Sequence, residues 1–419
     1  MNKKKKILIL GGTTISKQIV YAAREIGLDV YVTDYYKDSP CKAISDKNFI
    51  ISCTDVDAVC DLIKKENIDG VIMGYADVLM SAYVKICEKA KLPCYANLQA
   101  IETTSNKSTF KNLCKKFNIP VVPEYSINDV NENRVKYPII IKPVDNSGAR
   151  GIYICNNKED FNKFYNEALK YSPSKQILIE QFLTGKEATI FYYLYDGKIY
   201  LLGVSDRHML KYDEKLLQLP IGYTFPSINQ NSFLKEENEN IKMMFKSLKM
   251  KEGMVFMQSF NDNGNYIIYE MGYRLTGSIE HHLFEKAYNF NHLKAILNYA
   301  VGNKVDVSAL ETININNPIM ANVTLLLNKG EIHHYEGITE AMNIPGVLHI
   351  HKSYKEGDII DESIMGKLSQ VGIRVLLYAE SHNKLIEMMD TVKNTIKVIS
   401  TDNKNMIIDN YRYKDICRI

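Results

Sequence analysis

The chain has 419 residues, a formal net charge of +3 and eight cysteines, none of them in a Cys-x-x-Cys pair. This length is enough for two or three domains, and the small, evenly spread charge excludes a strongly basic nucleic-acid-binding surface. Isolated cysteines favour a reducing compartment over a disulfide framework or a zinc site. Apolar runs are too short for a signal peptide or a membrane span, so we expect a cytoplasmic protein without nucleic-acid or membrane partners.

The first unit alternates strands and helices. Ile7–Leu10 is a predicted buried strand, and Gly11-Gly12 forms a turn at its carboxyl end. A helix over about residues 16–26 and a second strand at Val30–Val32 complete a βαβ opening. The turn lacks the third glycine of the dinucleotide fingerprint, which favours a substrate-side or structural role over NAD binding. We predict a Rossmann-like, parallel-sheet domain over residues 1–104.

The second unit carries a lysine and a glycine loop after a short apolar strand. It opens with an amphipathic helix over residues 106–117, which includes Lys107. The strand Ile139–Ile141 ends on Lys142 and is followed by the small residues of Ser147–Gly151. A lysine in this position presents a point charge to a phosphate, and glycines let backbone amides approach an anion. The pattern predicts a lid over a nucleoside triphosphate, with a solvated hairpin loop as the alternative.

A predicted hairpin follows further along, with strands at 253–258 and 266–270. If its turn centres near Asn263, Gln258 lies opposite about Ile268, and Glu270 sits on the same face diagonally across. Side chains placed in this way can share one small ion, and Mg²⁺ prefers carboxylate, amide-carbonyl and phosphate oxygens. Arg274 comes four residues after Glu270, where it can bind phosphoryl oxygens or a carboxylate in a fork. The alternative for Glu270 is a solvated residue at the rim of the sheet.

Other polar residues give weaker signals. Residues 228–247 are rich in Asn, Glu and Lys, which predicts a polar loop and a solvated helix. Arg207 and His208 follow an apolar strand and are candidates for the substrate or phosphate side of a site. His281-His282 point to different sides of a regular element, which indicates surface or helix-end roles instead of a shared metal.

In order and spacing, these motifs resemble those of the ATP-grasp superfamily, with closest similarity to its carboxylate–amine (L-amino-acid) ligase and purine-pathway branch. The residues that carry the resemblance are Lys107, Lys142 with its glycine loop, Glu180–Glu187, Gln258, Glu270 and Arg274. The resemblance implies a multidomain α/β and α+β fold. Its parts would be the Rossmann-like domain, an ATP-grasp domain over 105–317 with a mobile lid at about 122–187, and a C-terminal α+β subdomain over 318–419 that completes the grasp.

The resemblance also implies roles for individual residues. ATP would be bound by Lys107, Lys142, Ser147, Gly148, Gly151, Glu180, Gln181, Leu183 and Glu187. In this set the backbone of Gln181 and Leu183 would contact adenine, and Glu187 the ribose. Gln258 and Glu270 would carry Mg²⁺ or Mn²⁺. Lys142 and Arg274 would be catalytic, and Arg207, His208 and Arg274 would lie toward the substrate.

Two positions depart from the family pattern. The family usually shows Glu-x-Asn-Pro-Arg, whereas this chain has Gly272 in place of the asparagine. Gln258 stands where Asp or Glu is more usual. Because glycine has no side chain to offer a metal, the number of metal ions stays open.

The function implied by the resemblance is an ADP-forming ligase. It would activate a carboxylate, expected to belong to an amino acid, as an acyl phosphate and couple it to an amine. The alternatives are a purine-biosynthesis-like carboxylase or formate-using ligase, a nucleotide-binding regulatory protein without turnover, and an NAD-dependent oxidoreductase that rests on Gly11-Gly12 alone. Expected partners are ATP and the two small-molecule substrates, with a homodimer as the open expectation for assembly. We expect the loop Asn146–Gly151 to be less ordered without nucleotide.

Overall fold

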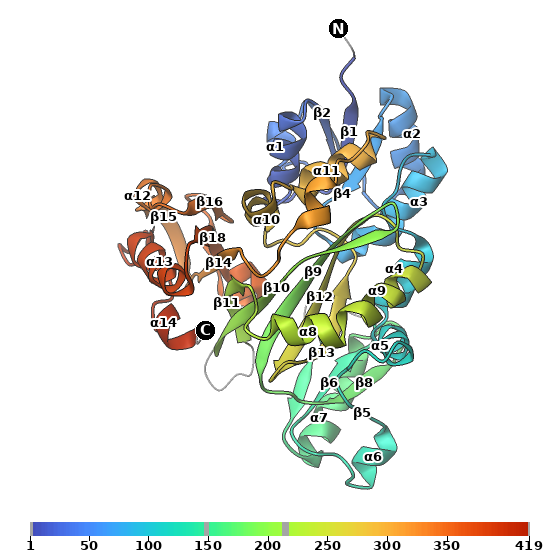
Figure 1. Ribbon diagram of the computed structural model, residues 1–419, viewed down its shortest axis with the longest axis vertical. Coiled ribbons are helices and arrows are strands. Elements are labelled where there is room, and N and C mark those ends of the chain that lie inside the picture. Colours follow the sequence, from blue (N-terminus) through green and yellow to red (C-terminus); the bar gives the residue numbers. More distant parts are fainter. Residues whose placement is uncertain (1–2, 146–150, 212–217, 418–419) are drawn as a thin grey trace.

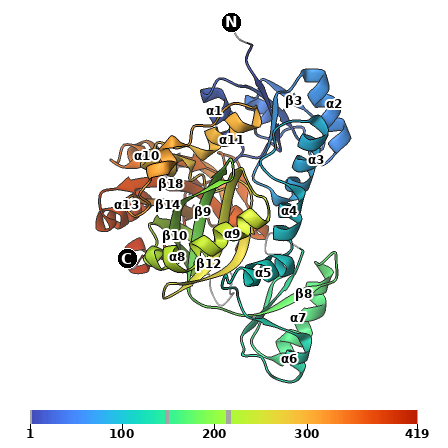
Figure 2. The ribbon, with the colours of Figure 1, turned by 45° about the vertical axis from the view of Figure 1, so that its right-hand side comes forward.

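A computed structural model describes residues 3–145, 151–211 and 218–417. One long central sheet joins three other parts: an N-terminal unit, a lid and a C-terminal layer (Figure 1). In a view turned by 45°, helix α5 (Lys107–Lys116) lies between the lid and the central sheet (Figure 2). This arrangement confirms the predicted fold class, an α/β unit followed by α+β parts.

The N-terminal unit is a parallel sheet of four strands in the order β3-β2-β1-β4. Strand β1 lies in the middle, and its residues from Ile7 to Leu10 are fully buried because helices cover both faces of the sheet. The elements of this unit are β1 (Lys6–Leu10), α1 (Lys17–Glu25), β2 (Asp29–Thr33), β3 (Lys47–Phe49), α2 (Val56–Glu66), β4 (Gly70–Met73), α3 (Met80–Ala90) and α4 (Leu98–Ser105).

The lid is a second four-stranded sheet, in the order β5-β8-β6-β7, with two helices. Its elements are β5 (Glu124–Tyr125), α6 (Ile127–Asn131), β6 (Ile139–Pro143), β7 (Tyr153–Cys155), α7 (Lys158–Lys170) and β8 (Ile177–Gln181). A small hydrophobic core of its own, which includes Val130, Ile141 and Phe161, is separate from the larger cores of the molecule. This core packs the lid strands against α6 and α7, and the mobility of the lid stays a prediction.

The central sheet has eight strands in the order β13-β12-β9-β10-β11-β14-β18-β16. These strands are β9 (Lys186–Tyr195), β10 (Lys198–Lys211), β11 (Gln218–Phe225), β12 (Gly253–Asp262), β13 (Asn265–Gly272), β14 (Ile319–Leu326), β16 (Val347–Lys352) and β18 (Val371–Ala379). The two-residue turn Asp196-Gly197 joins β9 to β10, and both residues have positive φ angles. Strand β11 lies in the predicted part over residues 105–317, and β14 lies in the predicted part over 318–419. Because these two strands pair, one sheet continues through both parts.

Helices cover the central sheet where a polar loop was expected. Residues 228–247 contain α8 (Gln230–Glu236) and α9 (Asn238–Ser247), and α10 (His281–Tyr288) and α11 (His292–Ala300) follow later. The prediction of a solvated helix is wrong, because Phe233, Ile241 and Phe245 are fully buried. In α9 the spacing of Ile241, Met244 and Phe245 marks an apolar face that the Asn-, Glu- and Lys-rich composition obscured.

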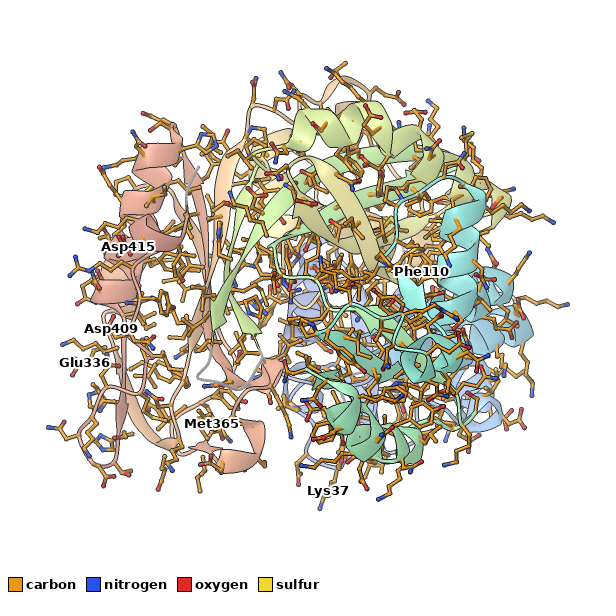
Figure 3. All side chains as sticks on the ribbon, turned by 90° about the horizontal axis from the view of Figure 1, so that it is seen from below. Lys37, Phe110, Glu336, Met365, Asp409 and Asp415 are labelled. Carbon is orange, nitrogen blue, oxygen red and sulfur yellow. The ribbon has the colours of Figure 1, made fainter. Side chains whose placement is uncertain are left out.

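The C-terminal layer adds a three-stranded sheet and a second large core. Its elements are β15 (Gly330–Glu336), α12 (Ile338–Met342), β17 (Ile359–Ile360), α13 (His382–Thr395), β19 (Lys397–Ser400) and α14 (Tyr413–Ile416). Seen from below, Phe110 lies among packed side chains, whereas Lys37 projects at the rim (Figure 3). Among the described residues, no helix combines the length and apolar character that crossing a membrane requires.

Candidate functional site

A cavity of about 640 Å³ lies between the lid and the central sheet. Its volume is in the range typical of small-molecule sites. It brings together nine of the residues predicted from sequence: Lys107, Lys142, Glu180, Gln181, Leu183, Glu187, Arg207, Gln258 and Glu270. Apolar side chains from both walls, among them Ile140, Ile154 and Phe260, complete the lining. The cavity therefore combines an apolar slot with a cluster of charges.

A buried chain of ion pairs fixes the lysine of the lid. Lys142 Nζ lies 2.5 Å from Glu180 Oε2, across the paired strands β6 and β8. The other oxygen of Glu180 is 2.5 Å from Lys111 Nζ, and Lys111 also pairs with Glu124 at 2.8 Å. The sequence motifs do not single out Lys111, although its position four residues after Lys107 places both on one side of α5. Glu180 is therefore already neutralised within the protein.

Lys107 begins helix α5 at the mouth of this cavity. The side chain of Asn106 caps the helix by accepting from the backbone N–H groups of Ser108 and Thr109. The Lys107 backbone N–H donates to the Val144 carbonyl at 3.1 Å. Burial lowers the pKa of Lys107 and nearby Lys142 lowers it further, while Glu270 opposes both effects. An anion such as a phosphate would offset the cost of placing the two cations together.

The opposite wall holds a second ion pair. Glu187 and Arg207 face each other across β9 and β10, with Oε2 and Nη1 2.6 Å apart. The Tyr269 hydroxyl donates to the same carboxylate oxygen at 2.9 Å and accepts from Arg207 at 3.1 Å. Tyr269 is a cavity residue that the sequence motifs miss. Its bonds keep Glu187 oriented into the cavity beside Phe260.

The register of the β12–β13 hairpin differs from the prediction. The turn is the two-residue Asn263-Gly264, and a bulge makes Tyr269 an extra residue between paired positions. Gln258 therefore lies directly opposite Glu270, and the predicted opposition to Ile268 is wrong. Bulges of this kind redirect side chains next to functional sites, and here the result is closer contact between the two candidate metal ligands.

The donor set of this hairpin suits a hard divalent cation. Glu270 offers a carboxylate and Gln258 an amide oxygen, both of which Mg²⁺ accepts. Within the described ranges, no group of three or more His, Cys, Asp or Glu side chains is arranged to bind a metal unaided. The remaining ligands of an ion at Gln258 and Glu270 would therefore be phosphate oxygens and water.

The backbone of the lid strand β8 limits how an adenine base could bind. The Gln181 N–H donates to the Pro123 carbonyl at 3.0 Å, so the carbonyl of Gln181 is the group left for a ligand.

Of the predicted glycine-loop residues, Ser147 and Gly148 lie outside the described residues, as do positions 146–150 in general. Gly151 is described and has a φ of 76°, and a Cβ there would lie 2.7 Å from Tyr171 Cβ.

Two predicted substrate residues do not line the cavity. His208 points to the face of β10 opposite Arg207, and its Nε2 lies 2.8 Å from Thr224 Oγ1. Burial lowers its pKa to about 4. Neighbouring residues on a strand alternate between faces, so Arg207 lines this cavity and His208 does not. A substrate-side role of His208 stays a prediction. Arg274 instead pairs with Asp77 of the N-terminal unit.

The adjacent histidines lie at a helix end, one of the two predicted positions. His281 begins α10 and is buried, so the surface alternative does not apply to it. His282 stacks on His349 with ring centroids 4.2 Å apart, and its Nε2 lies 3.2 Å from Gln18 Oε1. These contacts connect α1 of the N-terminal unit with α10 and with β16 of the central sheet.

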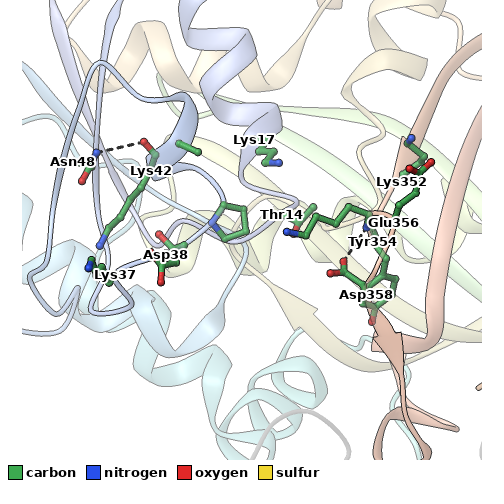
Figure 4. Close-up of a pocket in the computed structure, with 15 residues that line it drawn as sticks. Thr14, Lys17, Lys37, Asp38, Lys42, Asn48, Lys352, Tyr354, Glu356 and Asp358 are labelled. Carbon is green, nitrogen blue, oxygen red and sulfur yellow. Dashed lines mark hydrogen bonds between the residues drawn. The ribbon is translucent and has the colours of Figure 1, made fainter. Parts of the chain in front are cut away.

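A second cavity of about 990 Å³ lies beside the glycine turn of the N-terminal unit. Figure 4 shows Thr14 and Lys17 on one side and the segment from Lys352 to Asp358 on the other. Its lining includes five lysines: Lys17, Lys37, Lys42, Lys352 and Lys355. The Gly12 N–H donates to Asp34 Oδ2 at 2.8 Å, so this amide is already bonded within the protein.

The family comparison matches the segment that builds the first cavity. Residues 106–308 match the family model for the carbamoyl-phosphate synthase L chain, ATP binding domain. The chain carries an ATP-grasp domain. Lys107, Lys142, Glu187, Gln258 and Glu270 all lie inside the matched residues, so the cavity between lid and central sheet belongs to the ATP-grasp domain.

Similar proteins fall into several groups. Formate-dependent phosphoribosylglycinamide formyltransferase from Prochlorococcus marinus subsp. pastoris is 30% identical over 187 residues, which are 43% of this chain and 48% of that protein. The match thus spans about half the length of this curated relative. The L-amino acid ligase structure from Bacillus licheniformis has a TM-score of 0.76 at 16% identity, covering 96% of this chain and 100% of that one.

A second similar structure is the biotin carboxylase domain dimer of Hydrogenobacter thermophilus 2-oxoglutarate carboxylase, in complex with MgADP, ADP and bicarbonate. Its TM-score is 0.76 at 16% identity, and the match covers 97% of this chain and 92% of that chain. At such identities the likeness shows that this chain shares the overall fold of both solved structures, and it does not extend to their substrates.

Proposed function

We propose that this ATP-grasp chain is an ATP-dependent ligase that activates a carboxylate as an acyl phosphate, joins it to an amine, and releases ADP and phosphate. The observation that carries the proposal is the convergence of Lys107, Lys142, Gln258 and Glu270 on one cavity between two separate sheets. Two cations and an oxygen-donor pair at one end of an apolar slot match the chemistry of a nucleoside triphosphate.

Each wall of the cavity has its own part in this proposal. Lys107 and Lys142 bind phosphate oxygens, and the Gln181 carbonyl accepts from the adenine amino group. Glu187, held by Arg207 and Tyr269, accepts from the ribose hydroxyls. Gln258 and Glu270 hold Mg²⁺ or Mn²⁺, which when bound neutralises the charge that develops on the transferring phosphoryl group.

The reaction needs little covalent chemistry from the protein. A carboxylate oxygen attacks the γ-phosphorus and ADP leaves; the amine nitrogen then attacks the acyl carbon, phosphate leaves, and the amine loses a proton. Positioning and charge stabilisation supply the rate, which accords with a site built from lysines and an arginine. The lid, with its own core, would close over the acyl phosphate and keep water away from it.

The carboxylate and amine distinguish two versions of the proposal. Our first candidate is an amino-acid ligase, which is supported by the matching architecture of the Bacillus licheniformis L-amino acid ligase. The second is a formate-using or carboxylating ligase of the purine-biosynthesis type, favoured by the names of the curated relatives. For assembly we propose a homodimer, since a structure of similar fold is described as a dimer.

A screen for ADP and phosphate release tests the proposal. The protein is incubated with ATP, Mg²⁺ and pairs of amino acids, with a parallel arm that pairs formate or bicarbonate with amines. ADP release that needs both a carboxylate and an amine supports a ligase, and dependence on formate or bicarbonate selects the second candidate. Glu270→Gln is the control that should remove turnover. Tight ATP binding without turnover on any pair would point to the regulatory, non-catalytic alternative.

A further inference from the structure

An aromatic ring fills the space beside the carboxylate that is proposed to hold the metal. Gly272 lies two residues after Glu270 on β13, and Phe256 lies directly opposite Gly272 on β12. A Cβ built on Gly272 would lie 2.2 Å from Phe256 Cε1 and Cζ, closer than real Cβ contacts come. The ring is 8% exposed and therefore well packed. No side chain fits at position 272 unless the ring moves.

This packing limits the oxygen donors of the hairpin. The residues that β12 and β13 contribute to the cavity are Gln258, Phe260, Tyr269 and Glu270. The Tyr269 hydroxyl already donates to Glu187. The Glu270 carboxylate and the Gln258 amide oxygen remain for a metal ion. The neighbouring Phe256 and Gly272 have no side-chain oxygen that could bind one.

The other carboxylates that line the cavity are already paired. Glu180 is bonded by Lys111 and Lys142, and Glu187 by Arg207. Beyond Gly272, the Tyr273 hydroxyl donates to the backbone carbonyls of Tyr95 and Glu252. The Arg274 guanidinium lies over the Phe256 ring at 5.2 Å and is paired with Asp77. A second divalent ion would meet no unpaired carboxylate there, because the Asp77 carboxylate is already bonded by the Arg274 guanidinium.

We propose that the nucleotide site takes a single divalent cation, on Gln258, Glu270 and phosphate oxygens, and that the Phe256–Gly272 packing excludes a second. This inference rests on the proposed nucleotide site. It gives Phe256 a role in selecting metal number, and it makes Glu270 the one charged protein ligand. Metal binding then depends on the nucleotide, because two protein oxygens are too few to hold the ion alone.

Mn²⁺ titration followed by electron paramagnetic resonance counts the ions directly, without turnover. The full chain is titrated with Mn²⁺ alone and in the presence of the non-hydrolysable analogue AMP-PNP, whose own binding is checked by equilibrium dialysis. We expect weak Mn²⁺ binding alone and one tightly bound ion per chain with the analogue. Two bound ions, or none while the analogue is bound, would overturn the inference. Failure of the analogue to bind would instead contradict the proposed function.

Variants distinguish the role of the Phe256 ring from that of the proposed metal ligands. Glu270→Gln should weaken Mn²⁺ binding about tenfold or more, whereas Asp262→Asn, at the exposed tip of the same hairpin, should leave it unchanged. The double change Phe256→Ala with Gly272→Asn removes the ring and adds an amide, and should admit a second ion. Phe256→Ala alone should still bind one. A folded double variant that binds only one ion would refute the role assigned to the ring. If the double variant does not fold, the number of Mn²⁺ ions bound per wild-type chain still tests the inference.

Discussion

Arg274 and Asp77 form a two-pronged ion pair between the end of the metal-bearing hairpin and the N-terminal unit. Arg274 Nε lies 2.5 Å from Asp77 Oδ1, and Nη2 lies 2.8 Å from Oδ2. The third donor group, Nη1, donates to the Leu275 carbonyl at 2.9 Å. Each nitrogen of the guanidinium therefore has a protein partner in this structure. For Arg274 to bind a transferring phosphoryl group, Asp77 must release or share it.

Replacing Arg274 by lysine should separate chemistry from nucleotide affinity. Arg274→Lys keeps the charge but loses the fork, so we expect kcat to fall by about 10²–10³-fold with ATP affinity largely retained. Steady-state kinetics on the active substrate pair, with ATP binding measured separately, checks this. Asp77→Asn is the matched control, since it disrupts the same ion pair from the other side. Equal effects of the two variants would mean that the ion pair has only a structural role.

Removing Lys142 should weaken nucleotide binding. Lys142→Ala deletes a cation from the lid wall, while Glu180 keeps its second partner Lys111, so the loss should appear mainly in the site. We expect a cost of about 2–4 kcal/mol in binding and turnover together, as for other deleted charge stabilisers. Calorimetric titration with ATP measures the binding part. Lys136→Ala, an exposed lysine of the same lid, serves as control. Unchanged kinetics in folded Lys142→Ala would make this lysine a structural residue.

Lys111 should matter for stability far more than its neighbour Lys115. Lys111→Met leaves Glu180 and Glu124 short of a buried partner, which should cost about 3–5 kcal/mol of unfolding free energy. Lys115 pairs with the same Glu124, but its side chain is 50% exposed, so Lys115→Met should cost about 0–1 kcal/mol. Denaturant unfolding of both variants tests the contrast. Similar losses of unfolding free energy in the two variants would show that burial does not make the Lys111 ion pairs more important for stability than the Lys115 pair.

Glu237 should make stability depend on pH in the neutral range. Burial raises the pKa of this carboxyl from 4.5 to about 7. Between these values the unfolded chain releases the proton while the folded chain keeps it, so Glu237 lowers stability as pH rises from about 4.5 to 7 and adds no further loss above that. Thermal unfolding at a series of pH values should show a smaller decline for Glu237→Gln than for the wild type. Glu236→Gln, at the exposed neighbour, removes a charge that contributes less than burial to the raised pKa of Glu237, so the decline should persist in that variant.

Much of the fold follows from local patterns. The βαβ opening, the helix at Lys107, the strand before Lys142 and the turn at Asp196-Gly197 all form where periodicity and turn residues place them. In these segments the apolar spacing and the turn residues favour the same local structure. The helices over 230–247 were obscured because their apolar face is narrow and their other faces are strongly polar.

The candidate site is less accessible from sequence, because it depends on register and on pairs between distant elements. The direct opposition of Gln258 and Glu270 comes from a bulge at Tyr269, and one extra residue is enough to change the pairing of every position beyond it. The partners of Glu180 and Arg274 come from other elements, Lys111 on α5 and Asp77 in the N-terminal unit. No motif at either end of these pairs identifies its partner.

Identification of the nucleotide product tests the central claim most directly. The protein is allowed to turn over ATP on the most active carboxylate–amine pair, and adenine nucleotides, phosphate and pyrophosphate are separated and quantified against the coupled product. The account predicts ADP and phosphate in equal amounts with the product, because Lys107, Lys142 and Glu270 are proposed to serve attack at the γ-phosphorus. AMP and pyrophosphate in stoichiometric amounts would contradict it.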